Sequence, residues 1–154
     1  MILQKEQITR EHNRNMDDIS NGGGILQKTK ILTVTNKIGY AKNSEGVTSV
    51  FANTDIGAGD LIEVATLLEV SDMVMTNREI ADHVFTVNPE SKQYAIGLGF
   101  ACLYQHNDKP NAEWNIPSDK KEIRFTAKDD IKKSEEITIS YGKNYFLSRE
   151  KKEE

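Results

Sequence analysis

Sulfur and imidazole ligands are scarce in this sequence. Its 154 residues include a single cysteine, Cys102, and three histidines, His12, His83 and His106. One thiol cannot form an intramolecular disulfide, and it cannot build a zinc site that needs several thiolates. No two histidines have the i, i+4 spacing of a helical metal site. We therefore expect no bound metal, and we expect Cys102, which lies inside an apolar run, to be an inert core thiol.

Long apolar runs and segregated charge are also missing. No stretch of about 18 apolar residues occurs, and the N-terminal sequence MILQKEQITREHNRNMDD is charged throughout, which fits neither a membrane span nor a secretory signal. The 20 basic and 24 acidic residues are mixed along the chain and give a net charge of −4. Nucleic-acid-binding proteins typically have clustered positive charge instead. We expect an intracellular protein that binds neither membranes nor nucleic acid directly.

The sequence does contain enough apolar residues for one folded domain. Hydrophobic residues make up 37% and charged residues 29% of the chain, and a chain of this length buries roughly 70% of its unfolded surface on folding. Residues 1–27 are polar and include Asn21-Gly22-Gly23-Gly24, which tolerates many backbone conformations. We expect an N-terminal extension over residues 1–27, one domain over residues 28–149 and a charged tail over residues 150–154.

Short β-type runs separated by turn residues dominate the rest of the chain. Such runs predict strands, and together they predict a mainly β fold. A brief helix is expected to open at Thr76 or Asn77, either of which can serve as its N-cap. The predicted strands are ILTVT at 31–35, VTSVFA at 47–52, LIEVATLLEV at 61–70, EIRFTA at 122–127 and EITIS at 136–140.

A weak internal repeat relates residues 52–62 to residues 127–137. In each segment a strand ends, an Asp-Ile pair follows, and an acidic residue after a tight turn precedes the next strand. The pairs are Asp55-Ile56 and Asp130-Ile131. Chance recurrence of ordinary turn chemistry explains either copy alone. The shared spacing favours a repeated corner, in which an apolar isoleucine lies under a turn that joins two antiparallel strands.

The segment at 94–114, YAIGLGFACLYQHNDKPNAEW, changes abruptly in character. It is apolar up to Tyr104 and then continues as Gln105-His106-Asn107-Asp108. A buried run that ends in hydrogen-bonding side chains is a candidate binding site, although a lone histidine there is more often structural than catalytic.

A second candidate is the strand that ends at Tyr141, where the segment EEITISYGKNYFL covers residues 135–147. A tyrosine at a strand end is usually half-buried packing with its hydroxyl bound to a backbone group. No Ser-His-Asp order and no Cys-His pair with a credible nucleophile stands out elsewhere. Hydrolase chemistry therefore has little support in the sequence.

Three segments resemble the SET-domain protein lysine methyltransferases. SVFANTDIGAGDLIE at 49–63 is similar to the family's opening Gly-Val-Phe-Ala corner. LGFACLYQHNDKPNAEW at 98–114 is similar to its Asn-His-Ser-x-x-Pro-Asn motif, and EEITISYGKNYFLSR at 135–149 to its closing Glu-Glu-Ile-Thr-Ile-Ser-Tyr-Gly motif. The last two, in this order and at this distance, are highly specific. The likeness covers about Ile31 to Arg149 and is closest to small stand-alone viral and bacterial members without zinc modules.

This resemblance implies a SET-domain β-clip, which consists of several small antiparallel sheets, a few short helices and a C-terminal pseudoknot. In the pseudoknot the closing segment threads beneath the strand that carries Gln105 and His106. General topology rules would reject such threading as rare. The resemblance also implies S-adenosylmethionine as cofactor and a protein or peptide lysine as methyl acceptor. A free lysine has a pKa near ~10.4, so the family needs a narrow aromatic channel that favours the neutral amine.

The resemblance assigns roles to individual residues. Tyr141 matches the catalytic tyrosine, whose hydroxyl orients the amine and the methyl group. The positions implied to bind the cofactor are Val47, Ser49, Gln105, His106 and Tyr141, and the positions implied to line the lysine channel are His83, Tyr104, Tyr145 and Phe146.

Several of these positions depart from the family pattern. Val47-Thr48-Ser49 replaces a Gly-x-Gly whose backbone approaches the cofactor, and Gln105 replaces an asparagine. His83 replaces a channel tyrosine, Asn107 a serine, and Ser134 a turn glycine. Close backbone approach is harder beside a side chain than beside glycine.

Two functions therefore remain in view. The first is an active lysine methyltransferase, which the matching Tyr141 favours. The second is a SET-fold module that binds peptide or cofactor without efficient turnover, which Val47, Ser49 and Gln105 favour. The small viral relatives make a homodimer plausible, and a viral source would place the protein in the host nucleus rather than only in the cytoplasm.

Overall fold

The computed structural model describes residues 36–119, 121–142 and 145. By its internal contacts the chain divides into Met1–Ile31 and Leu32–Glu154, and all the described residues belong to the second unit. The predicted extension over 1–27, the strand predicted at 31–35, the tail over 150–154 and the predicted channel residue Phe146 lie outside the described residues.

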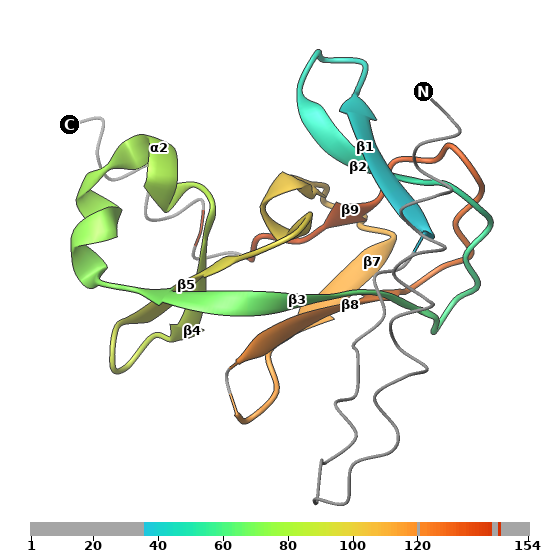
Figure 1. The fold of residues 1–154 in the computed structure, drawn as a ribbon. Helices are drawn as coiled ribbons and strands as arrows, with labels where there is room; N and C mark the ends of the chain where they lie inside the picture. The colour runs from blue at the N-terminus through green and yellow to red at the C-terminus, as the bar shows by residue number, and fades with distance from the viewer. Residues whose placement is uncertain (1–35, 120, 143–144, 146–154) are drawn as a thin grey trace, which may run out of the picture. The chain divides into compact units, whose positions relative to one another are not determined.

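The largest sheet has five antiparallel strands in the order β4-β5-β3-β8-β7. Its long strand, β3, pairs through residues 67–70 with β5 and through residues 61–66 with β8, so it is shared between the two halves of the sheet (Figure 1). The strands are β3 (Leu61–Val70), β4 (Val84–Asn88), β5 (Gln93–Gly97), β7 (Ala112–Asn115) and β8 (Glu122–Ala127).

One face of this sheet forms the core, because alternate residues of each strand point inward. Buried positions alternate along β8, at Ile123, Phe125 and Ala127. In β3 the register shifts between Leu61 and Glu63, and this bulge leaves both Ile62 and Glu63 buried. Glu63 alternates with the buried Ala65 and Leu67, so its carboxylate lies on the core face of the strand.

A separate hairpin joins β1 (Ile38–Lys42) to β2 (Thr48–Ala52) in antiparallel register. Its loop is closed by the side chain of Asn43, whose Oδ1 accepts the backbone N–H groups of Glu45 and Val47 at 3.0 Å each. Figure 1 shows the hairpin in cyan, apart from the five-stranded sheet, with β9 between the two.

The closing segment of the chain runs between strands that are far away in sequence. On one side, Ile137 donates to the Val50 carbonyl at 2.8 Å. On the other side, β9 (Thr138–Ile139) lies parallel to β6 (Gln105–His106). The Asn111 side chain fixes this arrangement, because its Oδ1 accepts Thr138 N–H and its Nδ2 donates to the Glu136 carbonyl, both at 2.9 Å. The pseudoknot expected from the family resemblance is confirmed.

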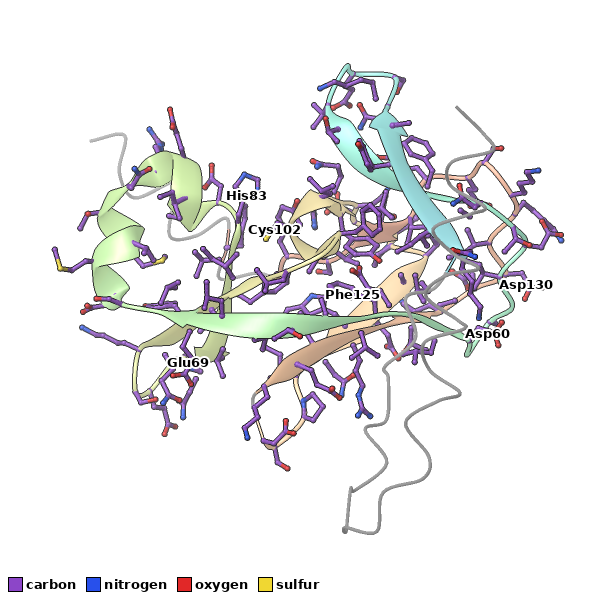
Figure 2. The ribbon with its side chains drawn as sticks, in the orientation of Figure 1. Asp60, Glu69, His83, Cys102, Phe125 and Asp130 are labelled. Carbon is purple, nitrogen blue, oxygen red and sulfur yellow. The ribbon has the colours of Figure 1, made fainter. Side chains whose placement is uncertain are left out.

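The sequence repeat corresponds to a pair of interlocked turns, which we call the double corner (residues 52–62 and 127–137). Ile56 and Ile131 exchange both backbone hydrogen bonds at 2.8 Å and are fully buried. Each copy's aspartate, Asp55 or Asp130, accepts a backbone N–H from the other copy's turn at 2.9 Å. Figure 2 shows Asp60 and Asp130 together at this end of the molecule. The predicted repeated turn with its buried isoleucine is therefore confirmed, and its two copies hold each other. Neither copy joins two antiparallel partner strands as predicted, because β2 does not pair with β3 and β8 does not pair with β9.

Short helices connect β3 to β4. The 3₁₀ helix η2 (Asp72–Thr76) is followed by α2 (Arg78–Ala81), and the N-cap of α2 is Asn77, whose side chain accepts the N–H groups of Glu79 and Ile80. A second 3₁₀ helix, η3 (Ala101–Leu103), precedes β6. No helix among the described residues is long and apolar enough to cross a membrane.

The strands predicted from the sequence agree with the structure in part. The ranges 61–70 and 122–127 are β3 and β8, and the strand predicted at 47–52 begins one residue later. The range 136–140 was too long, because only Thr138–Ile139 forms a ladder. Strands β1, β4, β5 and β7 were not predicted.

Candidate functional site

Tyr141 is the meeting point of the two motif segments. It follows β9 and is half-buried. Its hydroxyl donates to the Tyr104 carbonyl at 2.7 Å, and its backbone N–H donates to Nδ1 of His106 at 3.2 Å. The parallel pairing of β6 with β9 places these groups side by side. Both ends of Tyr141 are thus anchored to the segment that carries Gln105 and His106.

The hydrogen bond of the Tyr141 hydroxyl limits what this group can do. A phenol has one proton to donate, and here it is directed to the Tyr104 carbonyl. Toward a substrate the hydroxyl can therefore act only as an acceptor. An acceptor at this position suits the N–H of an amine or the polarised C–H of a methyl group, and it does not suit a general acid.

His106 is held in one tautomer by its two neighbours. Because Nδ1 accepts the Tyr141 N–H, the ring proton is on Nε2, which lies 3.1 Å from the Asp108 carboxylate. Asp108 itself is exposed. The imidazole therefore links the polar turn that follows β6 to the backbone of Tyr141.

Aromatic rings surround Tyr141. The Tyr145 ring meets it edge-on with centroids 4.7 Å apart, and the His106 ring is tilted against it at 5.4 Å. Trp114 reaches the same segment, since its Nε1 donates to the Ser140 carbonyl at 3.0 Å. The structure thus brings three of the predicted site residues, Tyr141, Tyr145 and His106, together.

Tyr104 contributes differently from the role that the family resemblance implied. Its ring is 1% exposed and stacks on Phe125 at 4.3 Å, while its hydroxyl donates to Glu63 at 2.9 Å. The ring therefore lies in the core and does not line a channel in this structure. The part of Tyr104 that reaches the site is its carbonyl, which binds the Tyr141 hydroxyl.

Gln105 joins the site to the start of β2. Its Nε2 donates to the carbonyls of Thr48 and Leu103 at 3.1 Å each. This places the Val47–Ser49 segment beside β6. Val47 is 42% exposed, whereas Ser49 is fully buried and its Oγ has no hydrogen-bond partner.

His83 lies beside η3. None of the contacts recorded among the described residues joins it to Tyr141. Its Nδ1 is 3.2 Å from the Cys102 carbonyl, and the two residues are adjacent in Figure 2. The Cys102 thiol donates to the Gly97 carbonyl at 3.1 Å, and burial raises its pKa. Cys102 is half-buried, so its assignment to the core was wrong, but a raised pKa still makes it a poor nucleophile.

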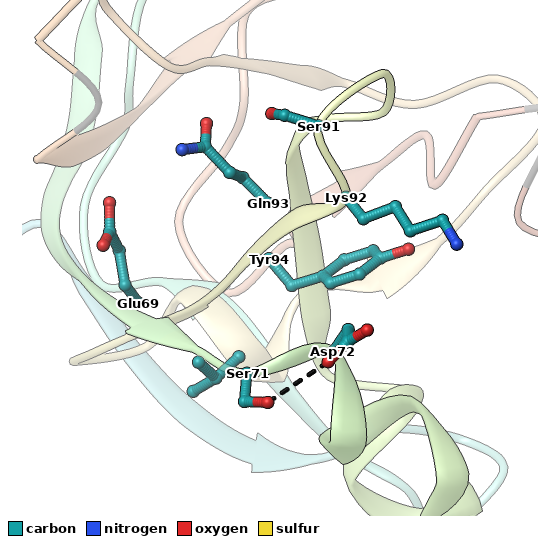
Figure 3. A pocket seen from close by; sticks show the side chains of 8 residues that line it. Glu69, Ser71, Asp72, Ser91, Lys92, Gln93 and Tyr94 are labelled. Carbon is teal, nitrogen blue, oxygen red and sulfur yellow. Dashed lines mark hydrogen bonds between the residues drawn. The ribbon is translucent and has the colours of Figure 1, made fainter.

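A polar cleft of about 360 Å³ lies at the far end of β3 (Figure 3). None of the predicted site residues borders it, so it is separate from the site around Tyr141. The residues that line it are Glu69, Val70, Ser71, Asp72, Ser91, Lys92, Gln93 and Tyr94.

Sequence reasoning missed Glu63, the buried partner of Tyr104. Its alternation with Ala65 and Leu67 places its side chain on the core face. A glutamate is rarely buried, however, so its residue type favours solvent exposure. A charged residue between apolar neighbours was the one available signal.

Known proteins resemble this chain in sequence and in fold. The family profile described as SET domain matches residues 48–142, more than half of the chain. A Schizosaccharomyces pombe protein named histone-lysine N-methyltransferase, H3 lysine-37 specific, is 26% identical over 98 residues, which are 58% of this chain and 66% of the relative. The chain thus spans slightly less than two thirds of that curated relative.

Solved structures of similar fold include histone methyltransferases. A Plasmodium falciparum protein assigned as a histone methyltransferase has a TM-score of 0.63 and 26% identity, covering 73% of this chain and 99% of that one. Polycomb Repressive Complex 2 of Chaetomium thermophilum, with an inhibitor bound, has a TM-score of 0.59 and 25% identity over 70% of this chain and 15% of that one. A ctPRC2 structure bound to S-adenosylmethionine shares the fold, with a TM-score of 0.58 and 21% identity over 74% of this chain and 17% of that one.

The motif order, the threaded closing segment and the profile match all agree, and the chain belongs to the SET-domain family.

Proposed function

We propose that this protein is a protein-lysine N-methyltransferase that uses S-adenosylmethionine. The observation that carries the proposal is the anchoring of Tyr141, whose hydroxyl binds the Tyr104 carbonyl and whose backbone binds His106. A fixed acceptor beside the strand that the family uses for its cofactor is what an amine-orienting group requires.

The residues around Val47 are compatible with the cofactor, despite the loss of the family's glycines. Ser49 is fully buried and its side chain points inward, so it does not occupy the surface beside β6. Val47, Ser49, Gln105 and His106 would hold S-adenosylmethionine, largely through backbone groups, next to Tyr141. The bound cofactor supplies a methyl group on a sulfonium centre.

The rings around Tyr141 would act on the lysine side chain. Tyr145 and His106 flank Tyr141. A lysine amine beside these rings would exchange contacts with water for apolar and π contacts. Desolvation lowers the pKa of an amine from its usual ~10.4 and so favours the neutral nucleophile. The Tyr141 hydroxyl, as an acceptor, would direct the lone pair of that amine toward the methyl group.

The substrate is proposed to be a lysine in a histone-tail-like or other protein segment. The support is the name of the Schizosaccharomyces pombe relative, which is specific for a histone H3 lysine. Homodimer formation and an intracellular location stay predictions.

The competing function is a SET-fold module that binds without efficient turnover. Two observations favour it. Val47 carries an exposed side chain where the family has glycine, and the Gln105 amide is already bound to the carbonyls of Thr48 and Leu103.

Titration calorimetry with S-adenosylmethionine and S-adenosylhomocysteine separates the two functions when it is combined with a methyl-transfer assay. The proposal expects saturable binding of both ligands and methyl transfer that Tyr141→Phe lowers by at least about 100-fold. Tyr94→Phe, which changes a tyrosine at the separate polar cleft, serves as the matched control and should leave transfer unchanged. Cofactor binding without any transfer to lysine peptides would favour the binding module.

A further inference from the structure

Glu63 is a buried carboxylate with two hydrogen-bond donors. It is 7% exposed; its Oε1 accepts the Phe100 N–H and its Oε2 accepts the Tyr104 hydroxyl, both at 2.9 Å. Burial raises its pKa, although both hydrogen bonds act in the opposite direction. None of the ion pairs recorded among the described residues includes Glu63. A buried carboxylate without a counter-ion costs stability, so its presence calls for a reason other than core packing.

The two donors lie at opposite ends of η3. Phe100 is the N-cap of this 3₁₀ helix and has no side-chain cap, while Tyr104 is its C-cap. One carboxylate therefore holds both ends of the turn that leads into Gln105 and His106. The carboxylate binds the backbone N–H of Phe100 itself.

Gly99 makes this close approach feasible. Its φ is +75°, and a Cβ atom there would lie 2.6 Å from Oε1 of Glu63. A side chain at this position would displace the carboxylate from the Phe100 N–H. The backbone at Gly99 and the Glu63 side chain are thus fitted to each other.

Tyr104 connects Glu63 to the reaction site. Its hydroxyl is bound by Glu63, its ring is fixed by stacking on Phe125, and its carbonyl binds the hydroxyl of Tyr141. We propose that Glu63 is a positioning residue for methyl transfer, which sets the place of the Tyr141 hydroxyl through Tyr104. This inference rests on the proposed function.

A positioning role and a purely structural role predict different kinetics. If Glu63 only stabilises the fold, its loss lowers the amount of folded enzyme, and the surviving enzyme keeps the wild-type KM values and recovers the wild-type kcat at lower temperature. If Glu63 aims Tyr141, its loss lowers the kcat of fully folded enzyme, because misplacement of a reacting group acts on the transition state. The KM values for peptide and cofactor then change little.

The experiment measures kcat and KM for wild type, Glu63→Gln, Tyr104→Phe and the double variant, at a temperature where circular dichroism shows each to be folded. We expect each single variant to lower kcat about tenfold with KM within about threefold. Because both act through one contact chain, the double variant should be no worse than about twofold below the lower single variant. Glu69→Gln, an exposed glutamate of the same strand, should match wild type.

Different results overturn different claims. Active wild type with unchanged kcat in Glu63→Gln and Tyr104→Phe, or with losses that multiply in the double variant, overturns the positioning role and leaves the proposed function intact. An inactive wild-type protein overturns the proposed function and the inference with it. If Glu63→Gln does not fold, Tyr104→Phe decides, because it keeps the ring that stacks on Phe125 and removes only the hydroxyl.

Discussion

At the scale of single residues, a few polar side chains hold together segments that are distant in sequence. Asn111 binds the closing segment at Glu136 and Thr138, and Gln105 binds the start of β2 at Thr48. Buried polar groups stabilise a fold only when their hydrogen bonds are made. Each of these side chains therefore specifies one arrangement of strands that apolar packing alone would leave ambiguous.

Asn111→Ala tests this role. The variant removes the acceptor of the Thr138 N–H and the donor to the Glu136 carbonyl, so two part-buried backbone groups lose their partners. We expect the free energy of unfolding to fall by about 2–4 kcal/mol, measured by urea denaturation. Asn115→Ala, at an exposed position of β7, is the control and should change it by less than about 0.5 kcal/mol.

Glu63 gives the stability of the protein a defined pH dependence. Its pKa in the folded state lies above the ordinary value of 4.5, so the folded state binds the proton more tightly than the unfolded state does. The stabilisation from this proton is fully present below pH 4.5 and is lost as pH rises through the raised pKa. The free energy of unfolding of wild type relative to Glu63→Gln should therefore decrease as pH rises over that window.

The measurement is urea denaturation of both proteins at a series of pH values. Subtracting the two curves cancels groups that titrate identically in both, such as Asp55, whose pKa is lowered chiefly by the Lys133 backbone hydrogen bond. A difference that stays flat, or rises with pH, would contradict a raised pKa at Glu63.

Individual site residues could be predicted only where a family motif covers them. Tyr141 and His106 were placed in this way, and the structure brings them into contact. The core position of the Tyr104 ring was not predicted, because its hydroxyl is bound by Glu63, a residue type that is rarely buried. The composition of a single sequence gives no sign that this glutamate is buried.

At the scale of elements, the two turns of the double corner have the same backbone conformation. Gly59 and Ser134 occupy the same position in the two copies, and both have positive φ, +87° and +70°. The backbone N–H of each donates to the carbonyl of an alanine at 2.8 Å, Ala127 for Gly59 and Ala52 for Ser134. The geometry is shared, but only one copy has the residue that adopts it without strain.

Ser134→Gly and Gly59→Ala are therefore expected to have opposite effects. Ser134→Gly relieves the left-handed conformation of a side-chain-bearing residue and should raise the free energy of unfolding by about 0.5–1 kcal/mol. Gly59→Ala introduces the strain and should lower it by about 1 kcal/mol; no atom lies within 4 Å of the added Cβ, so steric clash does not contribute.

Ser44→Gly is the control for this pair. Ser44 is exposed and is not among the described non-glycine residues with positive φ, so glycine there should destabilise slightly through the unfolded chain. Thermal denaturation compares all three variants. Stabilisation by Ser44→Gly equal to that by Ser134→Gly would show that backbone strain is not the cause.

Elements were predictable where a run of β-forming residues is long and bounded by turn residues. Strands β3 and β8 have ten and six residues, and their ranges follow directly from the pattern. Strand β9 has two residues and exists because the closing segment pairs with β6, some thirty residues earlier in the chain. Such long-range pairing leaves little local signal in the sequence. The length of β9 was therefore overestimated, and the threading of the closing segment was predicted only from the family resemblance.

At the scale of the whole molecule, the fold brings three distant segments to one place. The β2 start, β6 and the closing segment meet because Gln105 contacts Thr48 and Tyr141 contacts His106. The double corner lies at one end of the described domain and the polar cleft at the other. The proposed function depends on the threaded segment. Tyr141 contacts Tyr104 and His106 because this segment pairs with β6.

Transfer of methyl groups to lysine peptides is the most direct test of the proposed activity. Purified protein is incubated with S-adenosylmethionine and an array of lysine-containing peptides that includes histone-tail sequences, and products are read by mass spectrometry. We expect at least one peptide to gain the mass of a methyl group on a lysine. We expect Tyr141→Phe to abolish this gain while it still binds S-adenosylhomocysteine. Undiminished transfer by Tyr141→Phe would contradict the role of the anchored hydroxyl, and no transfer to any lysine by wild type that binds the cofactor would contradict the proposed function.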